Sequence, residues 1–382
     1  MDFDFSEEQR MLKDSVDRLV TDRYDFDARK VHARGEHGFS EEIWKQCAEL
    51  GLLALPFSEE DGGFGGGAVE TMLVMESLGR ALALEPYVAT VVLSGGLLRH
   101  AASPAQRAEL VPQIASGELK LAFAHAERHA RYNLAHVETR ARKEGDAYVL
   151  DGEKSLVLNG DAADKLIVSA RVKGTNRDRD GIALFLIDAK AHGVSRRGYA
   201  TQDGARAAEI TLSGVRVPAD AALGEPGKAL AAIERTVDEA IAALCAEAVG
   251  CMEAMHKDTV EYLKTRKQFG VTIGSFQALQ HRAVEMFVAL EQARSITMYA
   301  TMMAGESDAA ERGRAMSAAK AQVGRSVRFV GQQAIQLHGG VGMTYELKVG
   351  HYFKRATMID MMFGDADHHL AKLAAMGGLI AA

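Results

Sequence analysis

Two segments in the C-terminal half of the chain carry residue types that suit a ligand with phosphate groups and an aromatic ring. The first, residues 262–270, reads Tyr-Leu-Lys-Thr-Arg-Lys-Gln-Phe-Gly. Arg266 offers a planar fork of N–H donors that matches a pyrophosphate. Phe269 presents a flat ring that can lie against an aromatic ligand. Taken alone, Arg266 reads more simply as an ordinary surface charge.

The second segment, residues 333–342, reads Gln-Ala-Ile-Gln-Leu-His-Gly-Gly-Val-Gly. Gln336 can both donate and accept hydrogen bonds. Gly339 and Gly340 lack a Cβ atom, so a ligand can approach their backbone amides closely. The simpler interpretation of the two glycines is that they end a helix.

Acid–base chemistry needs a carboxylate, and Glu247 stands out as a lone acid within residues 241–252. Its functional interpretation is a catalytic base or a substrate-binding group. Its structural interpretation, which we favour, is a buried acid that is hydrogen-bonded within a bundle or at a subunit contact. Asp365 and Asp367 are weaker candidates for a base, because aspartates just before a helix commonly cap its N-terminus.

Composition excludes several other functions. The three cysteines, Cys47, Cys245 and Cys251, lack metal-ligand spacing and a disulfide pattern, so we expect no metal and a reducing compartment. A net charge of -7 argues against nucleic-acid binding. No apolar run approaches the ~20 residues of a membrane span. The first five residues are acidic and do not resemble a signal peptide, so we expect a cytoplasmic protein.

The elements that must position these residues follow an order of helices, strands and helices. Residues 1–118 show three- and four-residue apolar spacing, with a capping-box signature at Ser6 and Gln9. Short runs rich in Val, Ile and Leu then predict an antiparallel β-barrel domain over residues 119–222. No proline follows Pro226, and residues 228–382 predict a four-helix bundle, with Ser275 and Ser307 as expected helix caps. The fold class is therefore α+β with three domains.

The two segments together closely resemble the R-x-Q-F-G…F-Q and Q-x-x-G-G-x-G motifs of the acyl-CoA dehydrogenase family, with Phe276-Gln277 as the F-Q pair. The three-part layout resembles that family too, so the resemblance covers essentially the whole chain. It implies an oligomeric flavoprotein oxidoreductase of fatty acid metabolism that desaturates an acyl-CoA with FAD and passes electrons to an electron-transfer flavoprotein. It also implies that six residues reach the FAD of a neighbouring subunit: Arg266, Phe269, Gln277, Gln336, Gly339 and Gly340.

The sequence departs from the family at the catalytic base. Most members carry a glutamate in a Y-E-G-T-like run, and here Phe363 occupies that position. Some members carry the glutamate on the first bundle helix instead, at a position that falls on Ala240. Glu239 is adjacent, but one step rotates a side chain by ~100° around the helix. The base therefore stays unassigned.

The middle domain departs as well. The family's T-E-P-x-x-G-S-D run corresponds to residues 126–133, where only Glu127 is kept. The W-I-T run that covers the flavin ring reads Leu156-Val157-Leu158, although Asn159-Gly160 is kept. The resemblance thus implies that the chain has lost the groups that hold its own isoalloxazine. It has kept the groups that it lends to a neighbour.

Further segments resemble bacterial acyl-CoA dehydrogenases built from large and small subunits, with the small subunit of pimeloyl-CoA dehydrogenase as the nearest resemblance; they are residues 245–250, 363–366 and 367–369. We therefore expect a hetero-oligomer in which a large acyl-CoA dehydrogenase subunit supplies the base. The alternatives are a homo-oligomeric dehydrogenase with a non-standard base, a flavin-free interaction subunit and a flavin monooxygenase of the same fold. The acyl group is left open.

Overall fold

The computed structural model describes residues 5–377. The acidic start of the chain, on which the expectation about a signal peptide rests, lies largely outside these residues. The chain divides into two compact units. A helical unit contains residues 1–30, 68–83 and 241–382, and a sheet unit contains residues 31–67 and 84–240. No helix within the described range is long and apolar enough to cross a membrane.

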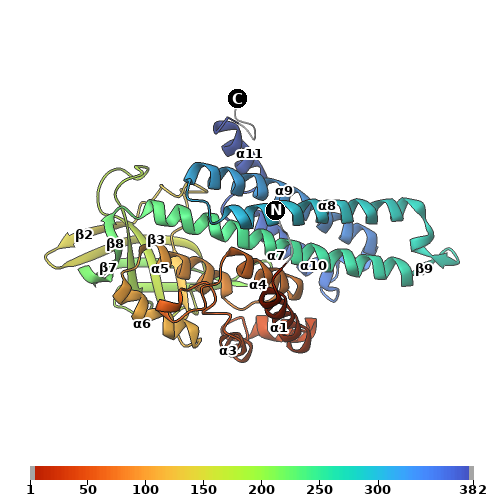
Figure 1. Cartoon of the computed structure of the whole chain (residues 1–382), viewed down its shortest axis with the longest axis horizontal. Coiled ribbons are helices and arrows are strands. Elements are labelled where there is room, and N and C mark those ends of the chain that lie inside the picture. Colours follow the sequence, from red (N-terminus) through yellow and green to blue (C-terminus); the bar gives the residue numbers. More distant parts are fainter. Residues whose placement is uncertain (1–4, 378–382) are drawn as a thin grey trace. The chain divides into compact units, whose positions relative to one another are not determined.

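The helical unit is built around long antiparallel helices (Figure 1). Helix α7 begins in the sheet unit and ends in the helical unit, whereas α2 begins in the helical unit and ends in the sheet unit. Its helices are α1 (Glu7–Arg23), α2 (Phe26–Arg34), α4 (Ala68–Ala81), α7 (Leu230–Thr265), α8 (Gln277–Met303), α9 (Ala309–His338), α10 (Lys348–Met361) and α11 (Ala366–Ala375). A short hairpin of β9 (Lys267–Gln268) and β10 (Val271–Thr272) and the turn η4 (Ile273–Ser275) connect α7 to α8, and η5 (Gly339–Met343) follows α9.

Local sequence explains several helix ends of this unit. Ser6 and Gln9 form the expected capping box of α1, and Gly339 ends α9 at a φ of 62°. Two expected caps are wrong. Asp308, rather than Ser307, caps α9, because its carboxylate accepts from two backbone amides of the first turn. Ser275 lies in η4, and α8 starts after Phe276 with no side-chain cap.

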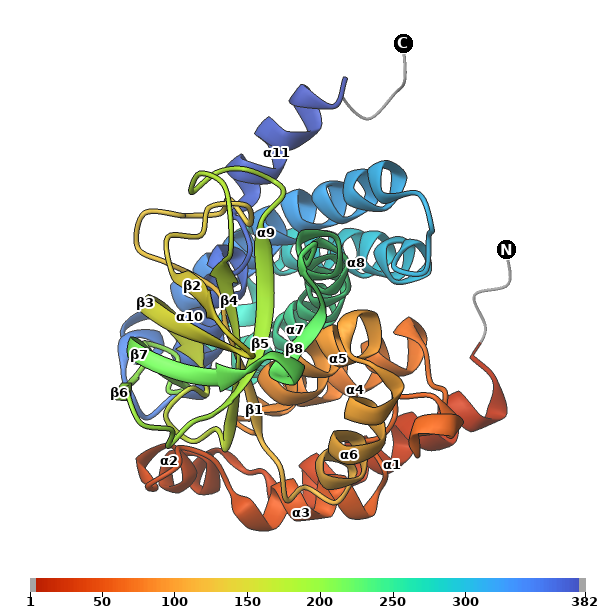
Figure 2. The same ribbon diagram turned by 90° about the vertical axis from the view of Figure 1, so that its left-hand side faces the viewer.

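Glycines allow the helices of this unit to pack backbone against backbone. A Cβ on Gly79 of α4 would lie 2.2 Å from the carbonyl oxygen of Glu247, and one on Gly250 of α7 would lie 2.0 Å from that of Glu76. Ion pairs surround this contact, with Arg294 of α8 bonded to Glu76 at 3.0 Å. Figure 2 looks nearly along α7 and α8, and shows α9 running beside α8.

The sheet unit contains an eight-stranded sheet whose strand pairs are mainly antiparallel. The exceptions are β1, which pairs with β4 in parallel, and a single parallel pairing between β2 and β4. The strand order is β6-β7-β3-β2-β4-β5-β8. The strands are β1 (Leu121–Ala124), β2 (Arg140–Glu144), β3 (Ala147–Leu158), β4 (Lys165–Arg171), β5 (Ile182–Asp188), β6 (Val194–Ala200), β7 (Arg206–Pro218) and β8 (Ala222–Gly227).

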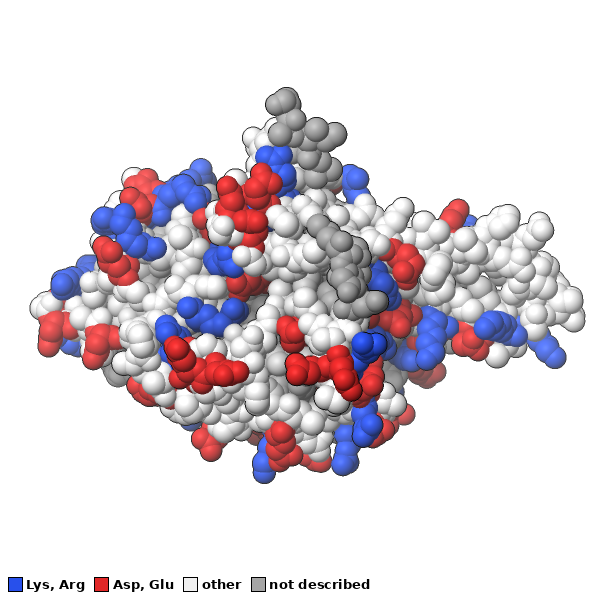
Figure 3. Space-filling view, in the orientation of Figure 1, with Lys and Arg blue, Asp and Glu red and all other residues white. Residues whose placement is uncertain are grey.

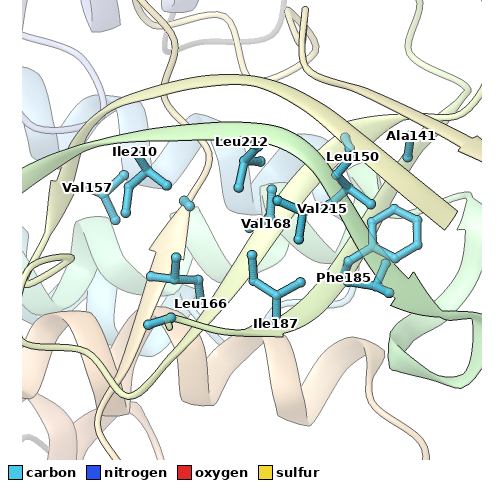
Figure 4. Packing of buried hydrophobic residues seen from close by; sticks show 14 of the residues in the cluster. Ala141, Leu150, Val157, Leu166, Val168, Phe185, Ile187, Ile210, Leu212 and Val215 are labelled. Atoms are coloured by element: carbon cyan, nitrogen blue, oxygen red, sulfur yellow. The ribbon is translucent and has the colours of Figure 1, made fainter. Parts of the chain in front are cut away.

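Apolar side chains fill the interior of this sheet (Figure 4). Leu150, Leu166, Val168 and Ile210 are fully buried there, and the rings of Tyr148 and Phe185 lie 4.9 Å apart. The same unit holds α3 (Glu41–Glu49), η1 (Glu59–Asp61), the π-helix η2 (Val88–Ser94), α5 (Gly95–Ala101), α6 (Pro104–Ala115) and η3 (Ala219–Ala221). The expected fold class of N-terminal helices, a sheet-rich middle and a C-terminal helical bundle is confirmed.

Candidate functional site

The hairpin between α7 and α8 presents the first group of expected site residues. Arg266 directly follows the last residue of α7, and Phe269 and Gly270 form the turn between β9 and β10. Both turn residues have positive φ, 56° and 80°, as a two-residue hairpin turn of the I′ type requires. Phe269 therefore stands out from the chain with 90% of its surface exposed.

The end of α9 lies beside this hairpin. The rings of Tyr262 and His338 are 4.5 Å apart, and Arg282 donates from Nη1 to Oε1 of Gln333 at 3.1 Å. A Cβ on Gly339 or Gly340 would meet nothing within 4 Å, so both glycines are open to a ligand. The fold thus gathers the six expected residues on one surface, which we call the bundle end: Arg266, Phe269, Gln277, Gln336, Gly339 and Gly340.

The bundle end fits the phosphate and adenosine half of FAD, the part that the family resemblance assigns to it. Arg266, Gln277 and Gln336 are exposed, and within residues 5–377 none of their side chains forms a hydrogen bond or ion pair. Their donors and acceptors are therefore available to a ligand. A guanidinium that contacts a phosphate forms a charge-assisted bond, and the two glycines leave backbone amides accessible.

The loop between α10 and α11 holds Phe363 at the position where the family has its base. Phe363 has a φ of 57°, which is uncommon for an aromatic residue. Buried donors fix this loop. Lys320 donates to the carbonyls of Asp360 and Gly364 at 2.7 and 2.8 Å, and His369 donates from Nε2 to the carbonyl of Phe363 at 3.1 Å. The phenyl ring cannot accept a proton, so this well-held position carries no base.

Two of the three candidate acids, Glu247 and Asp365, are engaged in structural contacts. Glu247 is 5% exposed and forms a two-pronged ion pair with Arg355, whose Nε and Nη2 lie 2.5 and 2.8 Å from its oxygens. Asp365 caps α11 by accepting from the backbone amide of His368 at 2.8 Å. Asp367 lies in the first turn of α11. Both contacts follow the structural interpretation of these residues.

Glu239, next to the alternative base position at Ala240, is also paired. Arg99 and His100 contact its two oxygens at 2.7 and 2.8 Å. Although burial acts in the opposite direction, the hydrogen bond from His100 and the charge of Arg99 lower the pKa of Glu239 to about 2. A carboxylate with so low a pKa is a poor base near neutral pH.

The sheet unit shows why Glu127 is kept while its neighbours differ. Its carboxylate accepts from the backbone amide of Thr139 at 3.0 Å, from the Thr139 hydroxyl at 2.7 Å and from Nζ of Lys154 at 2.7 Å. Burial lowers the pKa of Lys154 to about 8, although the Glu127 carboxylate acts in the opposite direction. Glu127 thus fixes the loop between β1 and β2. Ala126 and Leu158 offer no hydroxyl, so this region does not fit a flavin ring in the way the family does.

Sequence reasoning missed Lys320, His369 and Arg355. Lys320 left one signal, a single charge in the small-residue stretch 315–321, which is typical of a buried cation with specific partners. Arg355 left none, because it acts through Glu247, which lies 108 residues away along the chain. His369 contacts the carbonyl of Phe363, only six residues away, but no sequence pattern marks that contact. No group of three or more potential metal ligands occurs in the described part of the chain.

Comparisons with known proteins identify the family. The chain matches the acyl-CoA dehydrogenase N-terminal domain over residues 6–118, its middle domain over 122–215 and its C-terminal domain over 229–377. It is 31% identical over 373 residues to the probable acyl-CoA dehydrogenase YngJ of Bacillus subtilis (strain 168), covering 96% of this chain and 97% of the relative.

Among solved structures, a variant of the Tcur3481-Tcur3483 steroid ACAD has a TM-score of 0.87 at 29% identity, over 97% of each chain. The ChsE4-ChsE5 complex from Mycobacterium tuberculosis has a TM-score of 0.86 at 26% identity, over 100% of each chain. The chain belongs to the acyl-CoA dehydrogenase family and is an FAD-dependent oxidoreductase.

Proposed function

We propose that this chain works as the small subunit of a two-subunit acyl-CoA dehydrogenase and completes an FAD site that its partner holds. The observation that carries the proposal is a contrast within one chain. The bundle end offers unengaged donors and open glycines, whereas the Phe363 loop and the sheet unit lack the groups for acid–base work and for a flavin ring. Among the similar structures, the ChsE4-ChsE5 complex is named after two different chains, which supports such a pairing.

In the proposed pair, five of the six residues of the bundle end have a defined task. Arg266 binds the pyrophosphate of the partner's FAD with its planar guanidinium. Phe269 would lie against the cofactor, and Gln336 together with the backbone of Gly339 and Gly340 would hydrogen-bond it. The bound FAD would supply the acceptor for the hydride that leaves the β-carbon of the acyl group.

The partner then supplies the carboxylate that removes the α-proton. This chain does not, because Phe363 has no acidic group and Glu247 is committed to Arg355. A homo-oligomer that used Glu247 as its base would have to break the buried ion pair and leave Arg355 without a counter-charge. Loss of one partner of a buried ion pair costs about 3–5 kcal/mol. The hetero-oligomer avoids this cost.

We further propose that the pair acts in the cytoplasm, transfers electrons to an electron-transfer flavoprotein and is nearest to the pimeloyl-CoA dehydrogenase type. These details rest on the sequence resemblance. The two named chains of the ChsE4-ChsE5 complex support only the pairing itself. The acyl group of the substrate remains to be identified by turnover assays with a panel of acyl-CoA thioesters.

Flavin content tests the proposal. The chain is purified alone and after co-expression with candidate large subunits, and FAD is measured by absorbance. We expect a colourless isolated chain and a yellow complex that desaturates an acyl-CoA. Stoichiometric FAD on the isolated chain would favour the homo-oligomeric or monooxygenase alternative. A chain that stays colourless with every partner that it binds would favour a flavin-free interaction subunit.

A further inference from the structure

The loop between β4 and β5, residues 172–181, is built around a buried arginine. Arg171 is 1% exposed, and within residues 5–377 every hydrogen bond of its guanidinium goes to a backbone carbonyl. The five that lie between 2.8 and 3.1 Å belong to Ala135, Val137, Asn176, Asp178 and Asp180. Arg171 therefore fixes the shape of the β4–β5 loop and ties it to the end of the β1–β2 loop.

This arrangement turns backbone N–H groups of the β4–β5 loop outward. In a planar trans peptide, the C=O and N–H groups point in opposite directions. Because the carbonyls of Asn176 and Asp178 point to the guanidinium, the amides of Arg177 and Arg179 point away from it. Neither amide donates to another group within the described part of the chain. Two fixed backbone donors are therefore available to an anion.

The carboxylates at this loop are already engaged. Each has a partner: Asp178 accepts from Thr175, Asp180 faces Lys228 and Glu234 binds Arg179. By contrast, Lys173 and Arg177 are exposed, and among residues 5–377 their side chains contact no hydrogen-bond or ion-pair partner. Arg140 donates only to uncharged groups, the carbonyl of Gly174 and Oδ1 of Asn176. Positive charge is thus left without a counter-charge.

The local charge is opposite to that of the whole chain. The loop and the residues bonded to it carry six cationic side chains against three carboxylates: Arg140, Arg171, Lys173, Arg177, Arg179 and Lys228 against Asp178, Asp180 and Glu234. The chain as a whole has a net charge of -7. Figure 3 shows Lys and Arg side chains among acidic ones at the upper left, where loops of the sheet unit lie in Figure 1. A local excess of positive charge in an acidic protein attracts anions.

We propose that the β4–β5 loop binds a phosphate group, held by the amides of Arg177 and Arg179 and by the side chains of Lys173 and Arg177. Guanidinium and ammonium groups form charge-assisted hydrogen bonds with phosphate oxygens, and fixed amides add donors at no cost in ordering. The fitting ligand is a phosphate dianion. It has two sources, free phosphate and the 3′-phosphate of coenzyme A. The site belongs to the sheet unit of this chain and does not depend on the proposed role in a partner's FAD site.

Titration of the full chain with inorganic phosphate, followed by the NMR signals of backbone amides, tests the site. We expect saturable shifts of the Arg177 and Arg179 amides, because these would donate to the anion. The amides of β7 are the internal reference and should not move. Sodium chloride at the same ionic strength controls for screening. Shifts that are absent, or that chloride reproduces in full, would overturn the proposal.

Side-chain variants test the two cations. The double variant Lys173→Ala/Arg177→Ala removes two exposed side chains without partners, so folding should be unaffected, and thermal unfolding checks this. Its affinity for phosphate should fall by at least about tenfold, as expected when charge-assisted bonds are lost. Lys190→Ala, at another exposed lysine of the sheet unit, is the matched control and should bind as the wild type does. Equal affinity in the double variant and the wild type would refute the site.

A comparison of coenzyme A with dephospho-coenzyme A, which lacks the 3′-phosphate, identifies the source of the phosphate. Calorimetric titration is carried out with the isolated chain and with its complex. Tighter binding of coenzyme A that disappears in Lys173→Ala/Arg177→Ala would assign the loop to the 3′-phosphate. Equal binding of the two coenzymes, with phosphate binding retained, would assign it to free phosphate. A chain that binds none of the three probes would contradict the proposal.

Discussion

Arg266, Gln277 and Gln336 point unengaged donors and acceptors into solvent from one end of the helical unit. Side chains with such freedom are common on protein surfaces. These three differ from ordinary surface residues in their neighbours, because Phe269 and the open backbone of Gly339 and Gly340 share the same surface. At the scale of residues, the account therefore depends on whether these side chains bind a ligand together.

Replacing Arg266 with Ala should weaken FAD binding in the assembled enzyme. Loss of a hydrogen bond to a charged group costs about 1.5–3 kcal/mol, which corresponds to roughly 10- to 150-fold in the FAD dissociation constant. FAD retained after exhaustive dialysis is the measurement. Lys267→Ala removes the neighbouring exposed charge and serves as the control. Equal retention in both variants and the wild type would remove Arg266 from the site.

Replacing Glu247 with Gln separates a structural acid from a base. The ion pair with Arg355 should be lost, and breaking a buried pair costs about 3 kcal/mol of folding free energy. Turnover of the assembled enzyme should change by less than about tenfold, or ~1.4 kcal/mol in the barrier. Thermal unfolding and steady-state kinetics measure the two effects. A near-total loss of turnover with full stability and flavin content would identify Glu247 as the base instead.

The backbone of the α10–α11 loop is closely held, although Phe363 within it offers no acid–base group. Gly364 has a φ of 114°, and a Cβ there would lie 2.4 Å from the ring of His368, so the turn accepts glycine alone. Lys320 and His369 bind three carbonyls of the same segment. Hydrogen-bond donors from α9 and α11 thus hold the backbone around Phe363.

Replacing Lys320 with Met should loosen this loop while leaving the helices intact. Methionine fills a similar volume, but the carbonyls of Asp360 and Gly364 lose their buried donor. We expect amide hydrogen exchange over residues 360–365 to accelerate by at least about tenfold, as local opening becomes easier. The rate of amide hydrogen exchange in β3 of the sheet unit, which should not change, is the internal reference. Unchanged exchange in the loop would mean that Lys320 is not what holds it.

Elements with a strong apolar period were predictable, and those defined by distant partners were not. The long helix α7 follows from its stripe of apolar residues, and β5 follows from its run of Ile, Leu and Phe. Strand β6 was missed because its side chains are largely exposed and carry two arginines, so only pairing with β7 defines it. Strand β3 (Ala147–Leu158) contains two register shifts in its pairing with β7, between Leu150 and Gly152 and between Lys154 and Val157, which the sequence did not predict.

The same limit applies to the site. The family resemblance named the six residues of the bundle end, and their role in FAD binding stays a prediction. Motif spacing did not predict the partners of Glu247 or Glu239, since ion pairs join side chains that are far apart in sequence. Whether a carboxylate is free to act as a base depends on such partners, so the sequence alone left that choice open.

At the scale of the whole molecule, buried histidines should make the fold sensitive to mild acid. Burial, with the nearby Lys154 charge acting in the same direction, lowers the pKa of His125 to about 3, and burial likewise lowers that of His369 to about 3. The folded state therefore binds fewer protons than the unfolded chain between pH 3 and the ordinary histidine pKa of about 6.5, so stability falls as pH falls through this window.

Each histidine should cost about 2 kcal/mol of unfolding free energy between pH 7 and pH 5. Urea unfolding at both pH values measures the loss. His125→Gln removes one titrating group, and it should lower the loss by about half of the combined effect. A variant that loses as much stability as the wild type on acidification would show that His125 titrates normally in the fold.

The central claim is that this chain lends residues to a partner's FAD and holds none of its own. The most direct measurement is the ratio of FAD to chains in the purified complex, with FAD from absorbance after denaturation and each chain from quantitative amino-acid analysis. The account predicts one FAD for each pair of one small and one large subunit, and no FAD on the isolated small subunit. Two FAD molecules per pair, or stoichiometric FAD on the isolated chain, would contradict it.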